Sequence, residues 1–127
     1  MNRGYIRLWR KFLDGGYIRN HKLCAFMLWS LLKANHQDGY EIVVGLQRVT
    51  LQPGQFIFGR TRAAEETGLS EQEIRTIMAF LRNIKFLTSK TTNKFSIVSI
   101  MNWTIYQAAN EGNQPANQPA TNHKQEQ

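Results

Sequence analysis

The segment GRTRAAEETGLSEQEIRTIMAFLRN, residues 59–83, constrains the fold of this chain most strongly. Residues 62–67 are mostly good helix formers. Gly68 is the residue type that commonly ends a helix in the left-handed conformation. Ser70, two residues on, is a favoured first residue for a new helix. The segment therefore predicts two short helices joined by a tight turn.

The second of these helices carries strong local signals. Ser70 and Glu73 have the Ser-x-x-Glu spacing of a capping box, in which the two residues satisfy each other's free backbone N–H groups. Apolar residues then recur at helical spacing and form one stripe. They are Ile74, Ile77, Met78, Leu81 and Ile84. We expect this stripe to face the core.

The opposite face of the second helix carries Gln72, Arg75, Thr76, Ala79 and Arg82. A small residue permits close approach, and long donors reach guanine edges or phosphates, as a helix in the DNA major groove requires. The alternative is an ordinary amphipathic helix with solvated arginines. The helix-turn-helix spacing and the basic character of the chain favour DNA binding.

A two-stranded hairpin is predicted directly after these helices. Residues 86–91 and 94–101 have strand character, and Thr92-Asn93 between them suits a turn. Lys90 and Lys94 flank the tip, where they would contact phosphates. Apolar residues occur on both faces of the second strand, so either both faces are covered or a bulge intervenes.

Two helices are expected before this region. Residues 5–13 read as an amphipathic helix, which Asp14-Gly15-Gly16 ends. A second helix over residues 21–34 is apolar almost all round between Leu23 and Leu32. Such a helix lies either in the core or at an interface with a second copy of the chain.

The middle of the chain predicts short strands. Residues 41–44 and 56–58 have strand character, and Gln52-Pro53-Gly54-Gln55 is a turn signal. Residues 45–51 either extend the first strand or form a loop. The fold class that follows is α+β: a winged helix-turn-helix with additional N-terminal helices and a small antiparallel β-sheet or wing.

Length and charge agree with a single basic domain. The chain has 127 residues, a net charge of +7 and a pI of about 9.9, which favours a polyanionic partner. Residues 107–127 contain one Lys and two Glu, so the preceding body carries +8. We expect a DNA-binding domain over residues 1–106, and a disordered Asn/Gln/Pro-rich tail or truncated linker over residues 107–127.

The composition disfavours several other classes of function. The single cysteine, Cys24, cannot form an internal disulfide, and the ten apolar residues from Leu23 to Leu32 are too few to span a bilayer. The histidines are scattered, and phosphate-loop motifs and a convincing carboxylate pair are absent from the sequence. We therefore expect a cytoplasmic protein that is not an enzyme, with no metal, cofactor or membrane partner.

Five blocks of this sequence resemble the N-terminal winged-helix domain of phage replication initiators, or replisome organisers, which are related to DnaD-type primosomal proteins. The blocks are GYIRLWRKFLD, LLKANHQDG, LQPGQFIFGR, EETGLSEQEIRT and KTTNKFSIVSIMNWTIYQ. They span most of residues 4–107, and GLSEQEIRT and TNKFSIVSIMNW are the most specific.

The resemblance implies origin-type binding of double-stranded DNA during phage or prophage replication initiation. It also implies self-association through the N-terminal helices, Leu23 to Leu32 in this sequence. Recruitment of a host helicase or helicase loader would belong to a further C-terminal domain. The competing hypotheses are a winged-helix transcriptional repressor and a primosome scaffold that does not bind DNA.

The expected DNA contacts fall into two groups. Ser70, Gln72, Arg75, Thr76 and Arg82 are predicted at the major groove and its edges. Arg60, Arg62, Lys90 and Lys94 are predicted to hold phosphates.

Overall fold

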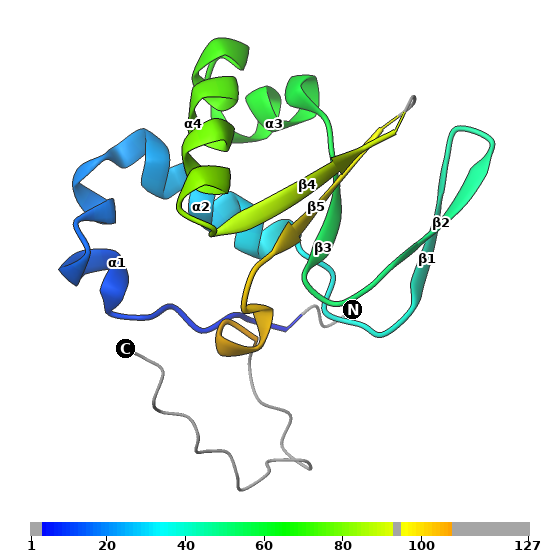
Figure 1. Cartoon of the computed structure of the whole chain (residues 1–127), viewed down its shortest axis with the longest axis horizontal. Helices are drawn as coiled ribbons and strands as arrows, with labels where there is room; N and C mark the ends of the chain where they lie inside the picture. Colours follow the sequence, from blue (N-terminus) through cyan, green and yellow to red (C-terminus); the bar gives the residue numbers. More distant parts are fainter. Residues whose placement is uncertain (1–3, 93–94, 108–127) are drawn as a thin grey trace, which may run out of the picture.

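The computed structural model describes residues 4–92 and 95–107, which form a mixed α+β fold with small antiparallel sheets (Figure 1). In chain order the elements are α1 (Lys11–Asp14), the 3-10 turn η1 (Tyr17–Arg19), α2 (His21–Lys33), β1 (Tyr40–Val44), β2 (Gln47–Leu51), β3 (Gln55–Phe58), α3 (Arg60–Thr67), α4 (Glu71–Asn83), β4 (Leu87–Thr91), β5 (Ser96–Ile100) and the 3-10 turn η2 (Trp103–Ile105). The predicted tail lies outside the described residues, apart from Gln107.

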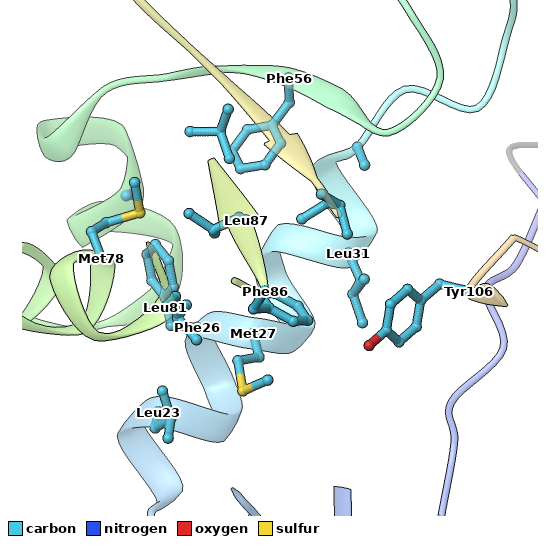
Figure 2. Close-up of a cluster of buried hydrophobic side chains, with 14 of the residues drawn as sticks. Leu23, Phe26, Met27, Leu31, Phe56, Met78, Leu81, Phe86, Leu87 and Tyr106 are labelled. Atoms are coloured by element: carbon cyan, nitrogen blue, oxygen red, sulfur yellow. The ribbon is translucent and has the colours of Figure 1, made fainter. Parts of the chain in front are cut away.

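Helix α2 runs through the centre of the hydrophobic core (Figure 2). It begins after Asn20, whose side chain accepts a hydrogen bond from the backbone N–H of Leu23. Its buried face includes Phe26, Met27 and Leu31, while Leu32 on the other side is 63% exposed. The prediction that this apolar run lies in the core is therefore confirmed for the face of α2 that carries Phe26, Met27 and Leu31.

Helices α3 and α4 meet at the predicted turn. Gly68 ends α3 with a left-handed φ of 79°, a conformation that favours glycine. Ser70 accepts from the backbone N–H of Glu73 at 3.0 Å, and the Glu73 carboxylate accepts from the backbone N–H of Ser70 at 2.9 Å. The predicted capping box is thus confirmed. Helix α3 begins at Arg60, two residues before the run of helix formers at residues 62–67.

The predicted hairpin is part of a three-stranded antiparallel sheet with the strand order β3-β5-β4. Its two strands are β4 and β5, each shorter than the predicted segments. The pairing of β4 with β5 is continuous, so the two-faced apolar pattern comes from cover on both sides of β5 and not from a bulge. Val98 and Ile100 are buried on one face, and Ile97 is half-buried on the other.

A second, separate hairpin pairs β1 with β2 and projects from the body (Figure 1). Residues 45–51, for which the sequence left two alternatives open, turn at Gly45-Leu46 and return as β2. Leu46 at this turn is fully exposed. The hairpin contributes no residue to the main buried cluster.

The predicted helix over residues 5–13 is wrong. Only Lys11–Asp14 form α1, and the residues before it are not helical. The backbone N–H of Arg7 donates to the carbonyl of Tyr106 at 2.7 Å, the Trp9 indole donates to the carbonyl of Ile105, and Ile6 pairs with Gln107. These distant contacts override the local helical pattern.

The backbone of Gly54 hydrogen-bonds to Asn35 and Ile100 and lies close to the side chain of Trp103. Its φ is +88°, its N–H donates to the carbonyl of Asn35 at 2.7 Å, and its carbonyl accepts from the N–H of Ile100 at 2.8 Å. A Cβ at this position would lie 2.8 Å from Cβ of the buried Trp103. Both the backbone conformation and the space therefore require glycine.

Replacing Gly54 by Ala should lower the free energy of unfolding by about 2–4 kcal/mol, because backbone strain and overpacking add. Gly45→Ala is the matched control: its φ is +63°, but nothing lies within 4 Å of the added Cβ. It should cost only about 1–2 kcal/mol. Urea unfolding followed by tryptophan fluorescence measures both. Equal costs would contradict the role given to the Trp103 contact.

Candidate nucleic-acid interface

A groove runs between α4 and the β4–β5 hairpin, and three arginines line it. Arg75 and Arg82 come from α4, and Arg60 comes from the first turn of α3. Arg60 also lines a shallower depression that continues along the hairpin past Thr91 and Phe95. Helices α3 and α4 thus bring cations that are up to 22 positions apart in the sequence to one surface, and the strands of the hairpin form the facing side of the groove.

These three arginines have no acidic partner among residues 4–92 and 95–107. The ion pairs of this part of the chain are Lys22–Glu73, Lys33–Glu66, Arg48–Glu41 and Arg62–Glu65. The side chains of Arg60, Arg75 and Arg82 are exposed to solvent. Their charge is therefore available to an external anion.

The exposed face of α4 carries a short hydrogen-bonded network. The guanidinium of Arg75 donates to Oε1 of Gln72 at 3.0 Å, and the hydroxyl of Thr76 donates to the carbonyl of Gln72 at 3.1 Å. All three side chains are exposed. The network orients the side chains of Gln72, Arg75 and Thr76, which together present hydrogen-bond donors and acceptors on one face of the helix.

The other predicted site residues lie outside the groove lining. The Ser70 hydroxyl accepts the capping bond, and Arg62 on α3 faces Glu65 at 4.0 Å. Lys90 is exposed on β4 and pairs with Ile97, so it lies on the opposite face of the hairpin from Ser89 and Thr91. Lys94 lies outside the described residues.

Three hydroxyl residues of the groove were not anticipated from the sequence. Ser89, Thr91 and Ser96 line the side formed by the hairpin, and the hydroxyls of Thr91 and Ser96 are 3.1 Å apart. Strand alternation would have revealed them, since Ser89 and Thr91 are two residues apart and Thr91 is paired with Ser96. The groove thus combines cations with neutral donors, a combination that suits phosphate oxygens.

Two carboxylates of α3 and α4, those of Glu66 and Glu73, are held by other partners. A bond from the Lys22 ammonium, followed by the backbone N–H of Ser70, keeps the pKa of Glu73 below its usual range. The Trp29 indole and then Lys33 lower the pKa of Glu66 in the same way. Glu73 is thereby tied toward α2, and its negative charge is partly offset.

Within the described part of the chain, no group of three His, Cys, Asp or Glu is placed to hold a metal ion. No helix there is long and apolar enough to cross a bilayer. Comparisons with protein-family models, with curated proteins and with solved structures find no match for this chain.

The lowered pKa of Glu73 predicts a stability that depends on pH. The ionised carboxylate contributes stability at neutral pH, and this contribution is lost as the pH falls below 4.5, the ordinary value, through the lower pKa of the folded state. The variant Glu73→Gln should show a shallower loss of stability on acidification. Urea unfolding between pH 6 and about pH 3 measures it.

Glu71→Gln is the control for this experiment. It removes a charge from the same helix turn without breaking the bond to Lys22. An acid dependence that is identical in wild type and Glu73→Gln would contradict the linkage.

Proposed function

We propose that α2, β3, α3, α4, β4 and β5 form a winged helix-turn-helix that binds double-stranded DNA. The order helix, strand, helix, helix and hairpin supports this proposal, as does the pairing of β3 with the second strand of the hairpin. In this arrangement α4 enters the major groove as the recognition helix, and the β4–β5 hairpin is the wing.

The observation that carries the proposal is the groove with three arginines that have no acidic partner within the described residues. A phosphate contact by each cation releases counterions and supplies affinity that does not depend on sequence. Ser89, Thr91 and Ser96 add uncharged donors on the wing side. The DNA backbone would therefore pass between α4 and the wing, with Arg60 at the start of α3 closing the contact.

Base reading is assigned to the exposed face of α4. Gln72 and Thr76 stand one turn apart there, and Ala79 leaves room for close approach. Arg75 is linked to Gln72 and also lines the groove. In the proposed complex it would therefore lie between a base edge and a phosphate. Bidentate donation to guanine is the specific contact that an arginine makes most often.

The biological setting that we propose is phage or prophage replication initiation. Its support is the resemblance carried by GLSEQEIRT, which spans the turn and the first half of α4, and by TNKFSIVSIMNW, which leads into β5. These blocks supply the proposed DNA-binding unit. The N-terminal blocks GYIRLWRKFLD and LLKANHQDG lie around α1 and the end of α2, mostly outside the proposed DNA-binding unit.

Replacing Arg75 by Ala should weaken binding to the preferred duplex by about 1–3 kcal/mol and relax its sequence preference, because a base contact is lost. Arg60→Ala should weaken all duplexes alike and reduce the slope of log K against log salt by about 0.9. The site is first selected from a randomised duplex library. Fluorescence anisotropy at several salt concentrations then gives both quantities.

Arg48→Ala is the matched control, because Arg48 is an exposed arginine on the separate β1–β2 hairpin. It should leave the affinity and the salt slope nearly unchanged. An Arg75→Ala variant that binds the selected site at wild-type strength would overturn the base-reading assignment. Duplex binding no tighter than about 10⁻⁴ M would instead favour the scaffold hypothesis.

A further inference from the structure

The N-terminal segment places aromatic rings and cations side by side on the surface. We infer that residues 5–11 form a second nucleic-acid surface, which binds single-stranded nucleic acid by stacking bases on Tyr5 and Trp9 and by neutralising phosphates with Arg7, Arg10 and Lys11. This inference is independent of the groove between α4 and the wing.

The backbone of residues 6 and 7 holds the segment on the body, and the side chains of Tyr5 and Arg7 remain exposed to solvent. Ile6 pairs with Gln107 and is half-buried against the core. Because side chains alternate in extended chain, Tyr5 and Arg7 on either side of Ile6 point outward. Tyr5 is 72% exposed, a large value for an aromatic residue in a folded domain.

One hydrogen bond orients the indole ring of Trp9, and part of the ring remains exposed to solvent. Its indole N–H donates to the carbonyl of Ile105, and 38% of the residue is still exposed. The other two tryptophans differ: Trp103 is buried, and Trp29 packs against Phe26, Phe56 and Phe58. Trp9 is therefore an oriented, accessible ring.

The charge around these rings is strongly positive. Arg7, Arg10, Lys11 and Arg19 are all exposed, and none of them forms an ion pair within the described residues. Asp14 is the only acidic residue of the sequence up to Arg19. This charge disfavours a symmetric contact with a second copy, because the like charges of the two patches would face each other.

The combination of rings and cations fits an unpaired strand better than other polyanions. Unpaired bases present free π-faces to aromatic side chains, whereas the bases of a duplex are already stacked on one another. An anionic membrane also attracts cations and aromatics, but α1 has only four residues and offers no long amphipathic helix to lie in the interface. Single-stranded nucleic acid is thus the favoured ligand.

The position of the segment makes the two surfaces separate. In Figure 1 the N-terminal segment lies in the lower half of the folded body, whereas α3 and one end of α4 lie at the top. A duplex on α4 and an unpaired strand on residues 5–11 would therefore contact different ends of the molecule. This geometry suits DNA that is partly opened.

The test uses the full chain and two probes of about 12 nucleotides, oligo(dT) and an abasic strand with the same phosphates. Stacking predicts binding of oligo(dT) about tenfold tighter than binding of the abasic strand, together with quenching of Trp9 fluorescence. Tyr5→Ala should lose about tenfold for oligo(dT) and change little for the abasic strand. Leu8→Ala is the matched control, since Leu8 is 54% exposed but has no ring.

Two further variants separate this surface from the duplex site. Trp9→Phe should abolish most of the quenching and retain binding, because it keeps a ring for stacking. Arg75→Ala with Arg82→Ala should lose duplex affinity and retain the affinity for oligo(dT). If instead both affinities fall together in that double variant, one shared surface binds both ligands and the inference is overturned.

Other outcomes also overturn it. Equal affinity for oligo(dT) and the abasic strand would show that binding depends on phosphate charge alone and not on base stacking. Equal losses in Tyr5→Ala and Leu8→Ala would show that Tyr5 acts by general packing. Tighter binding to anionic phosphatidylserine vesicles than to oligo(dT) would assign the surface to a membrane.

Discussion

The packing of three members of the α4 stripe against the core determines which face of this helix is presented to solvent, whereas Ile84, the last predicted member, follows the helix and is 36% exposed. Ile74 and Leu81 are completely buried, and Met78 is nearly so. Each such side chain contributes about 1.5–3 kcal/mol when it leaves water. Because a helix has 3.6 residues per turn, fixing this stripe inward forces Arg75 and Arg82 toward the hairpin and Gln72 and Thr76 outward. The proposed recognition surface is a consequence of core burial.

Helices α3 and α4 and the turn between them could be predicted from sequence because their determinants are local. Gly68, Ser70 and Glu73 lie within six positions, and each acts on backbone groups beside it. The same locality explains why sequence could place Arg75 and Arg82 together on the exposed side of one helix, since both positions follow from the phase of that helix. What sequence did not reveal is that Arg60 joins them across the groove, because this depends on how α3 packs against α4.

The predictions failed or stayed open where long-range pairing decides the conformation. Residues 5–9 carry a helical pattern, yet they bond to residues 105–107 at the other end of the described chain. Residues 45–51 show no clear periodicity, so sequence could not separate strand from loop. Pairing with β1 makes Gln47–Leu51 the strand β2, and Gly45-Leu46 form the turn. Lys90 was correctly placed on a strand, but its face depends on the register with β5.

The bridge between Ile6 and Gln107 also determines how the domain responds to force. The two segments run antiparallel and meet at the ends of the described chain, so a pull applied through both ends loads the contacts one after another. The bond from Arg7 to Tyr106 and then the bond from Trp9 to Ile105 would break in succession, before any load reaches α2. Tension applied through both ends would thus detach the N-terminal segment first and leave α4 and its groove folded. Under such a pull, the segment that carries Tyr5 and Trp9 would be the first part of the fold to detach.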